Sequence, residues 1–168
     1  MYTLERAQQL ADETETTMLG TLEKTDLTSY CLPGIPDGLL RLQRLEATLA
    51  CATGNLEALA HKILQQASLN EYFSVVVCAQ PTTKDRSEII QQALVELQQQ
   101  GHPCHRQKTY VIGDTPSDIR AAKKLGLQSV AVATGHYSQE ELLKEQPDLV
   151  LPNSRGYNWF SSFPEKFI

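Results

Sequence analysis

The sequence predicts an α/β protein built on a Rossmann-like parallel sheet, with helices on both faces of the sheet. Short apolar runs alternate with amphipathic segments along the chain from residue 48 onwards. Glycine and other turn-forming residues follow several of these runs, where a strand would give way to a helix. Repeated βα units form parallel sheets, and right-handed crossovers bring the carboxyl ends of the strands to one side. The 168 residues suffice for one domain with a sizeable core.

The first part of the chain is predicted to be helical. Residues 3–24 are polar and free of proline, and their apolar side chains recur at loosely helical intervals. Residues 25–30 form a connector, and Pro33, Gly34 and Pro36 then interrupt the pattern before a helix over residues 38–45. We therefore place a boundary at residues 33–36. Residues 1–32 are predicted to be an accessory helical piece, and residues 33–168 the main domain.

Five strands alternate with four helices in the rest of the main domain. The predicted strands are short, and the second of them contains three consecutive valines, which favour a buried strand. They are predicted over residues 48–52, 73–79, 110–112, 129–133 and 148–151. The helices between them carry apolar side chains on one face. They are predicted over residues 56–66, 87–100, 117–125 and 138–145.

Composition and charge exclude several classes of protein. The net charge is −5, so no overall positive field favours nucleic acid or an acidic membrane surface. The sequence has no apolar run of about 18 residues and no targeting signal at its N-terminus, so we expect a cytoplasmic protein. The four cysteines form no close pair, and we expect them to be free thiols.

Two aspartates four residues apart follow the third predicted strand. Gly113 permits a tight turn at the strand end, Asp114 comes directly after it, and Ser117 is expected to cap the next helix. Asp118 then falls in the first turn of that helix. Two close carboxylates repel each other unless a cation lies between them, and oxygen ligands suit Mg²⁺. The alternative is a capped turn with a solvated aspartate.

Residues that suit a phosphate group follow the first two predicted strands. Thr53 offers a hydroxyl, Gly54 permits close approach of a ligand, and Asn55 is expected to cap the following helix. After the second strand, Arg86 or Lys84 supplies a cation. The alternative is an ordinary capped helix beside solvated basic residues. Together with the two aspartates, these residues are suited to binding a phosphoryl group with Mg²⁺.

Four short segments in this order resemble the haloacid dehalogenase-like hydrolases, in particular the phosphoglycolate-phosphatase-like branch. They are residues 52–55 (ATGN), 85–86 (DR), 113–118 (GDTPSD) and 132–135 (VATG). Residues 33–36 also resemble the point where that family's chain returns from a helical cap to its core, so residues 1–32 would be a cap remnant. The resemblance implies that Thr53 binds phosphate, that Arg86, or else Lys84, is the basic group, and that Asp114 and Asp118 hold Mg²⁺.

One motif of that family is absent from this sequence. The family's first strand ends in DxDGT, whose leading aspartate is phosphorylated and whose second aspartate acts as acid and base. Asp26 has no second aspartate two residues on and no strand before it. The resemblance places the missing strand between the strand ending near Thr53 and the strand ending at Gly113. A truncated product, half of a split protein and a pseudoenzyme all remain open.

The resemblance implies Mg²⁺-dependent hydrolysis of a small phosphomonoester as the family activity, and we expect this chain to be inactive as written. The expected partners are a small phosphorylated substrate and an N-terminal fragment or another partner that donates the missing strand. The first alternative is a non-catalytic module that binds phosphate and Mg²⁺ or has a regulatory role. The second is a receiver-like signalling domain, which is weaker because receivers carry an acid pair on their first strand.

Overall fold

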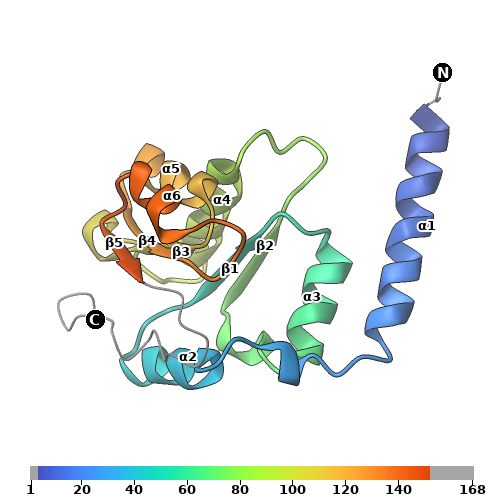
Figure 1. Ribbon diagram of the computed structural model, residues 1–168, viewed down its shortest axis with the longest axis horizontal. Helices are drawn as coiled ribbons and strands as arrows, with labels where there is room; N and C mark the ends of the chain where they lie inside the picture. The colour runs from blue at the N-terminus through green and yellow to red at the C-terminus, as the bar shows by residue number, and fades with distance from the viewer. Residues whose placement is uncertain (1–3, 152–168) are drawn as a thin grey trace.

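A computed structural model describes residues 4–151 of the chain and shows an α/β fold with helices on both faces of parallel strands (Figure 1). The α-helices are α1 (Leu4–Leu22), α2 (Ile35–Arg44), α3 (Glu57–Gln66), α4 (Arg86–Gln99), α5 (Pro116–Leu125) and α6 (Gln139–Lys144). The strands are β1 (Ala50–Thr53), β2 (Val75–Cys78), β3 (Tyr110–Gly113), β4 (Gln128–Val132) and β5 (Leu149–Leu151). Short 3₁₀ turns occupy Thr28–Tyr30, Asn70–Tyr72 and Arg106–Lys108.

The predicted elements are all present, and most of their ends lie within two residues of the prediction. The main difference is α2, which begins at Ile35 rather than at residue 38. Pro36 lies in its first turn, where proline is well tolerated because the amide hydrogen there needs no partner within the helix. Residues 152–168, which we assigned to the main domain, lie outside the described part of the chain.

Within residues 4–151 the strands form two parallel sheets rather than one, and the predicted class, an α/β fold on parallel strands, is confirmed. Among the described residues β1 pairs only with β2, and β3, β4 and β5 form a second sheet in that order. All three pairings are parallel. The alternation of apolar and amphipathic segments predicts strands, but pairing depends on which edges meet in space. β1 and β3 are not paired with each other.

The helices cover the strands in two layers. On β4, Val130 and Val132 pack against Leu39 of α2, whereas Ala131 and Ala133 pack on the opposite face. That opposite face is covered by Ile119 of α5 and Leu142 of α6. Helix α4 covers β1 and β2 on the same side, while α3 packs on β2. The prediction of helices on both faces is therefore confirmed.

One helical layer joins the two sheets. Ile90 of α4 and Ala122 of α5 belong to a single buried cluster. Ala52 of β1 and Val111 of β3 both pack against that cluster. β1 and β3, which do not pair with each other, are thus held next to each other by α4 and α5. Side chains of both strands pack against the same apolar cluster.

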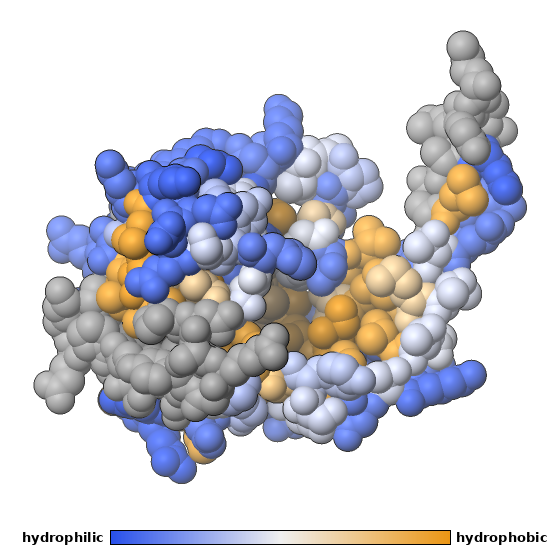
Figure 2. Space-filling view, viewed as in Figure 1, coloured by the Kyte–Doolittle hydropathy of each residue, from blue (hydrophilic) through white to orange (hydrophobic). Residues whose placement is uncertain are grey.

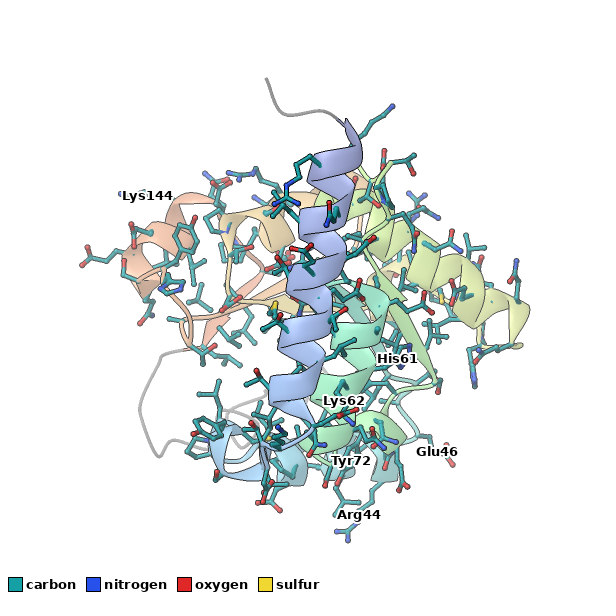
Figure 3. The ribbon with its side chains drawn as sticks, turned by 90° about the vertical axis from the view of Figure 1, so that its right-hand side faces the viewer. Arg44, Glu46, His61, Lys62, Tyr72 and Lys144 are labelled. Atoms are coloured by element: carbon teal, nitrogen blue, oxygen red, sulfur yellow. The ribbon has the colours of Figure 1, made fainter. Side chains whose placement is uncertain are left out.

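Helix α1 lies alongside α3 at the margin of the molecule (Figures 1 and 3). Figure 2 shows apolar surface between α1 and the rest of the molecule, over α3. Met18 of α1 and Leu56, just before α3, are 47% and 44% exposed. The boundary at residues 33–36 remains a prediction; it falls where α2 begins. None of the helices among residues 4–151 is long and apolar enough to cross a bilayer.

Candidate functional site

The turn between β3 and α5 is closed by Thr115 and Asp118. The Thr115 Oγ1 accepts a hydrogen bond from the Asp118 amide at 3.3 Å, and the Asp118 Oδ2 accepts from the Thr115 amide at 3.2 Å. The Thr115 hydroxyl also donates to Asp118 Oδ2 at 2.7 Å. This reciprocal pair is a capping box, so Thr115 is the N-cap and the prediction of Ser117 was wrong. Pro116 sits in the first helical turn, which places the cap one residue before it.

The other oxygen of Asp118 forms an ion pair with Arg86. The Arg86 Nε lies 2.8 Å from Asp118 Oδ1, and the two side chains are 25% and 10% exposed. Arg86 Nη1 also donates to the carbonyl oxygen of Ala52 at 3.3 Å. Arg86 therefore connects the first turn of α4 with the end of β1 and the start of α5. Because the pair is largely buried, solvent screens it less than it screens a surface ion pair.

Asp85 fixes the position of Arg86 by capping α4. Its Oδ1 accepts from the Ser87 amide at 2.8 Å and from the Ser87 hydroxyl, and its Oδ2 lies 2.7 Å from Lys124 Nζ. The hydrogen bonds from Lys124 and Ser87 hold the pKa of Asp85 well below its usual range. Lys84, the other candidate cation, is exposed, and its amide donates to Glu88 Oε2 at 2.9 Å. The structure thus places Arg86 at the site.

Asp114 differs from Asp118 in having an uncommitted carboxylate. It is half-buried, and among residues 4–151 no hydrogen bond or ion pair reaches its side chain. Its carboxyl group lies against Gly135, where an added Cβ would overlap Oδ2 and come within 2.9 Å of Cγ. Gly113 likewise leaves space for Asp118, because a Cβ added at Gly113 would overlap the Asp118 carboxyl group. Two glycines therefore make room for the two carboxylates.

The loop after β1 has a different local structure from the one predicted. The Thr53 Oγ1 accepts from the Asn55 amide at 3.2 Å, so the hydroxyl bends the loop back on itself. Asn55 does not cap α3, because the N-cap is Leu56 and no side chain bonds there. Gly54 and Asn55 are exposed, and Thr53 is half-buried. Their polar groups are accessible from the strand-end side of the molecule.

The predicted site residues come from three strand ends, and the structure brings them to one side of the molecule. Arg86 and Asp118 are in direct contact, and the Arg86 bond to Ala52 places the end of β1 beside them. Thr53 follows Ala52 directly, although no bond links it to the aspartates in the described chain. No group of three or more histidine, cysteine, aspartate or glutamate side chains is gathered within residues 4–151. In the described part of the chain, the carboxylates available to a cation here are thus those of Asp114 and Asp118.

Sequence reasoning missed three contributors to this site. Thr115 was treated only as a turn residue, although Thr-x-x-Asp is the sequence pattern of a capping box. Asp85, placed just before the helix it caps, carried a similar signal. The Ala52 carbonyl carried none, because its contact with Arg86 spans 34 residues of sequence.

Comparison with known proteins agrees with the fold. The chain is 29% identical over 119 residues to a phosphoglycolate phosphatase of Agrobacterium fabrum, covering 71% of this chain and 49% of that protein. It is also 29% identical over 119 residues to a phosphoglycolate phosphatase of Synechococcus elongatus, covering 71% of this chain and 53% of that protein. The chain therefore spans about half the length of these curated relatives.

A solved β-phosphoglucomutase of Clostridium difficile has the same fold. It superposes with a TM-score of 0.75 and 18% identity, covering 99% of this chain and 66% of that one. The model of the haloacid dehalogenase-like hydrolase family matches residues 4–132. Because that match spans most of the sequence, the chain belongs to the haloacid dehalogenase-like hydrolases.

Proposed function

We propose that this chain carries the phosphate- and Mg²⁺-binding part of a phosphatase that acts on a small phosphomonoester. The observation that carries the proposal is the uncommitted carboxylate of Asp114 beside the Arg86–Asp118 ion pair. A free carboxylate and an oriented guanidinium thus both lie at the carboxyl ends of parallel strands. Such strand ends are where open α/β sheets bind ligands. The phosphatase names of the two curated relatives support the same class of substrate.

Each residue at the site has a role that follows from its contacts. Arg86 is fixed by Asp118 and by the Ala52 carbonyl, so its guanidinium is oriented before a phosphoryl group arrives. The Thr53 hydroxyl and the exposed amides of the following loop would donate to the other phosphoryl oxygens. Asp118 acts mainly by positioning Arg86 and the start of α5. This arrangement binds an anion without a large cost in ordering flexible side chains.

The donor set fits Mg²⁺ with Asp114 as its main protein ligand. Mg²⁺ is commonly held by one or two carboxylates together with water and substrate phosphate oxygens. Asp114 is uncommitted, whereas both oxygens of Asp118 already have partners. Asp118 would therefore join a metal only by sharing Oδ1 with Arg86 or by leaving it. When bound, the cation would neutralise charge on the phosphoryl group.

We propose further that the chain, as given, does not turn over substrate. Asp114 and Asp118 are engaged in binding and positioning, and Asp26 accepts from the Thr28 amide at 2.9 Å in the connector after α1. In this proposal Asp114 binds the cation and Asp118 positions Arg86, so neither of them attacks phosphorus. A non-catalytic phosphate- and Mg²⁺-binding module is the second candidate function, and this same observation favours it.

One pair of measurements distinguishes these functions. Hydrolysis of p-nitrophenyl phosphate with Mg²⁺ is compared between the wild-type chain and Asp114→Asn, and amide shifts are followed by NMR during Mg²⁺ and inorganic phosphate titrations. We expect no difference in turnover and a response of residues 113–118 and 53–55 in the titrations. Turnover that is lost in Asp114→Asn would contradict our view of catalysis. Silence of these residues up to tens of millimolar, beyond the range of weak hard-cation sites, would contradict the binding site itself.

A further inference from the structure

Two ion pairs connect the start of α4 with opposite ends of α5. Asp85 Oδ2 lies 2.7 Å from Lys124 Nζ. Arg86, the next residue, places its Nε 2.8 Å from Asp118 Oδ1. Asp118 is in the first turn of α5 and Lys124 in the last, so the two contacts are about 9 Å apart along the helix axis. The N-terminal cap of α4 is therefore attached to α5 at two points of opposite charge.

Lys124 is the basic residue in the last turn of α5 that reaches α4. Its neighbour Lys123 instead donates to the Glu145 carbonyl at 2.5 Å, at the end of α6. The two lysines carry the same charge at adjacent positions of one helix, and in the described chain it is Lys124 that contacts Asp85. Lys123 is therefore a matched control for the charge of Lys124.

Asp85 places a negative charge beside the group that is proposed to bind phosphate. Its Oδ1 accepts from the Ser87 amide at 2.8 Å and from the Ser87 hydroxyl, which holds it at the N-cap of α4. Because hydrogen bonds from Lys124 and Ser87 keep its pKa well below the usual range, the carboxylate stays ionised near neutral pH. Without Lys124, this charge would repel a phosphoryl group and would compete with Asp118 for Arg86.

Arg86 has donors left for a phosphoryl group while it keeps its present contacts. A guanidinium has five N–H donors, of which Asp118 takes the one on Nε and the Ala52 carbonyl takes one on Nη1. Within residues 4–151 the other three donors, at the outer end of the side chain, have no acceptor. Two of them form the planar fork that binds phosphate oxygens bidentately. The direction of this fork is fixed as long as the pair with Asp118 is intact.

We propose that Lys124 is a positioning residue for phosphate binding and acts through Asp85. By neutralising the cap carboxylate, it leaves Arg86 paired with Asp118 and keeps the free donors of Arg86 directed to the phosphoryl group. The Lys124 side chain is 61% exposed and lies at the opposite end of α5 from Asp118, so its effect requires no contact with substrate. The phosphate step rests on the proposed function, whereas the effect on Arg86 is present without ligand. Because exposed ion pairs are weak, the expected effects are about three- to fivefold.

The first test measures hydrogen exchange of the Arg86 Nε proton by NMR in the ligand-free chain at low ionic strength. We expect Lys124→Gln to speed this exchange about three- to fivefold, because Asp118 then holds the proton for less of the time. Lys124→Arg should keep the wild-type rate. Lys123→Gln should keep it too, since it removes the same charge without affecting a contact of Asp85. An unchanged rate in Lys124→Gln, or an equal change in Lys123→Gln, would overturn the proposal.

A double variant separates neutralisation of Asp85 from simple anchoring of the helix. Asparagine is also a good N-cap residue, so Asp85→Asn keeps the cap and removes the charge that Lys124 neutralises. We therefore expect Asp85→Asn combined with Lys124→Gln to restore the wild-type exchange rate. If the ion pair only anchors α4 to α5, the double variant would exchange as fast as Lys124→Gln alone, and the proposal would be wrong.

The last test is an NMR titration with inorganic phosphate at low ionic strength, followed at residues 53–55 and at Arg86. We expect Kd to rise about three- to fivefold in Lys124→Gln and to match the wild-type value in the double variant and in Lys123→Gln. Equal affinity of the wild-type chain and Lys124→Gln would contradict the positioning role. A wild-type chain that does not respond to phosphate would instead contradict the proposed function and with it the phosphate step, whereas the exchange rates still decide how Lys124 affects Arg86.

Discussion

The close contact between Gly113 and Asp118 gives a sharp test of how the site is built. In Gly113→Ala the added Cβ would overlap the Cβ and carboxyl group of Asp118. Asp118 cannot simply rotate away, because Arg86 holds one of its oxygens and Thr115 the other. The strand end or the start of α5 must therefore shift. Gly54→Ala is the matched control, since nothing lies within 4 Å of a Cβ added at Gly54.

The two alanine variants should change stability in opposite directions. Overpacking at Gly113 costs about 1–3 kcal/mol, and loss of the capping box adds about 1 kcal/mol. Replacing glycine by alanine recovers about 0.4–1 kcal/mol from the unfolded chain. The net loss for Gly113→Ala is therefore about 2 kcal/mol, which corresponds to a fall in Tm of roughly 4–8 °C for a chain of this size. Gly54→Ala keeps only the gain and should raise Tm by about 1–3 °C.

Urea unfolding followed by circular dichroism measures both variants under the same conditions. Each variant must show one transition with the wild-type slope, so that differences in midpoint report stability. A Gly113→Ala chain as stable as Gly54→Ala would refute the reasoning. It would show that α5 and its capping box move at no cost, and that the buried ion pair does not fix the site.

Two further predictions concern other contacts. Gly135→Ala should push the carboxylate of Asp114 aside and weaken Mg²⁺ binding about tenfold in an NMR titration, with little loss of stability; unchanged affinity would show that Asp114 is not the ligand. Asp148→Ala should lower the free energy of unfolding by about 2 kcal/mol at pH 7, because the buried Ser129 amide and hydroxyl, each 2.7 Å from Asp148 Oδ2, lose their acceptor. Burial raises the pKa of Asp148, but the hydrogen bonds from Ser129 lower it more, so the net pKa is depressed. The contribution of the carboxylate is therefore complete above about pH 4 and lost as pH falls through the folded pKa, and urea titrations between pH 2 and 7 should show this.

Local sequence patterns determine how much of the fold was predictable. The apolar runs and helix caps that define strands and helices lie within a few residues of one another, so their positions follow from the sequence. The division of the strands into two sheets does not follow from local patterns, because it depends on whether β1 and β3 pair in space. The apolar periodicity of Ala50–Thr53 is the same whether that strand lies inside a sheet or at its edge.

The site was predictable in its composition but not in its connections. Strand-end residues such as Thr53 and Asp114 follow from topology, because parallel strands end on one side. The local caps were misassigned at Ser117 and Asn55, where good capping residues lie one or two positions from the actual cap. The two aspartates appear equivalent in the sequence. Their different roles arise from tertiary contacts, because only Asp118 faces Arg86.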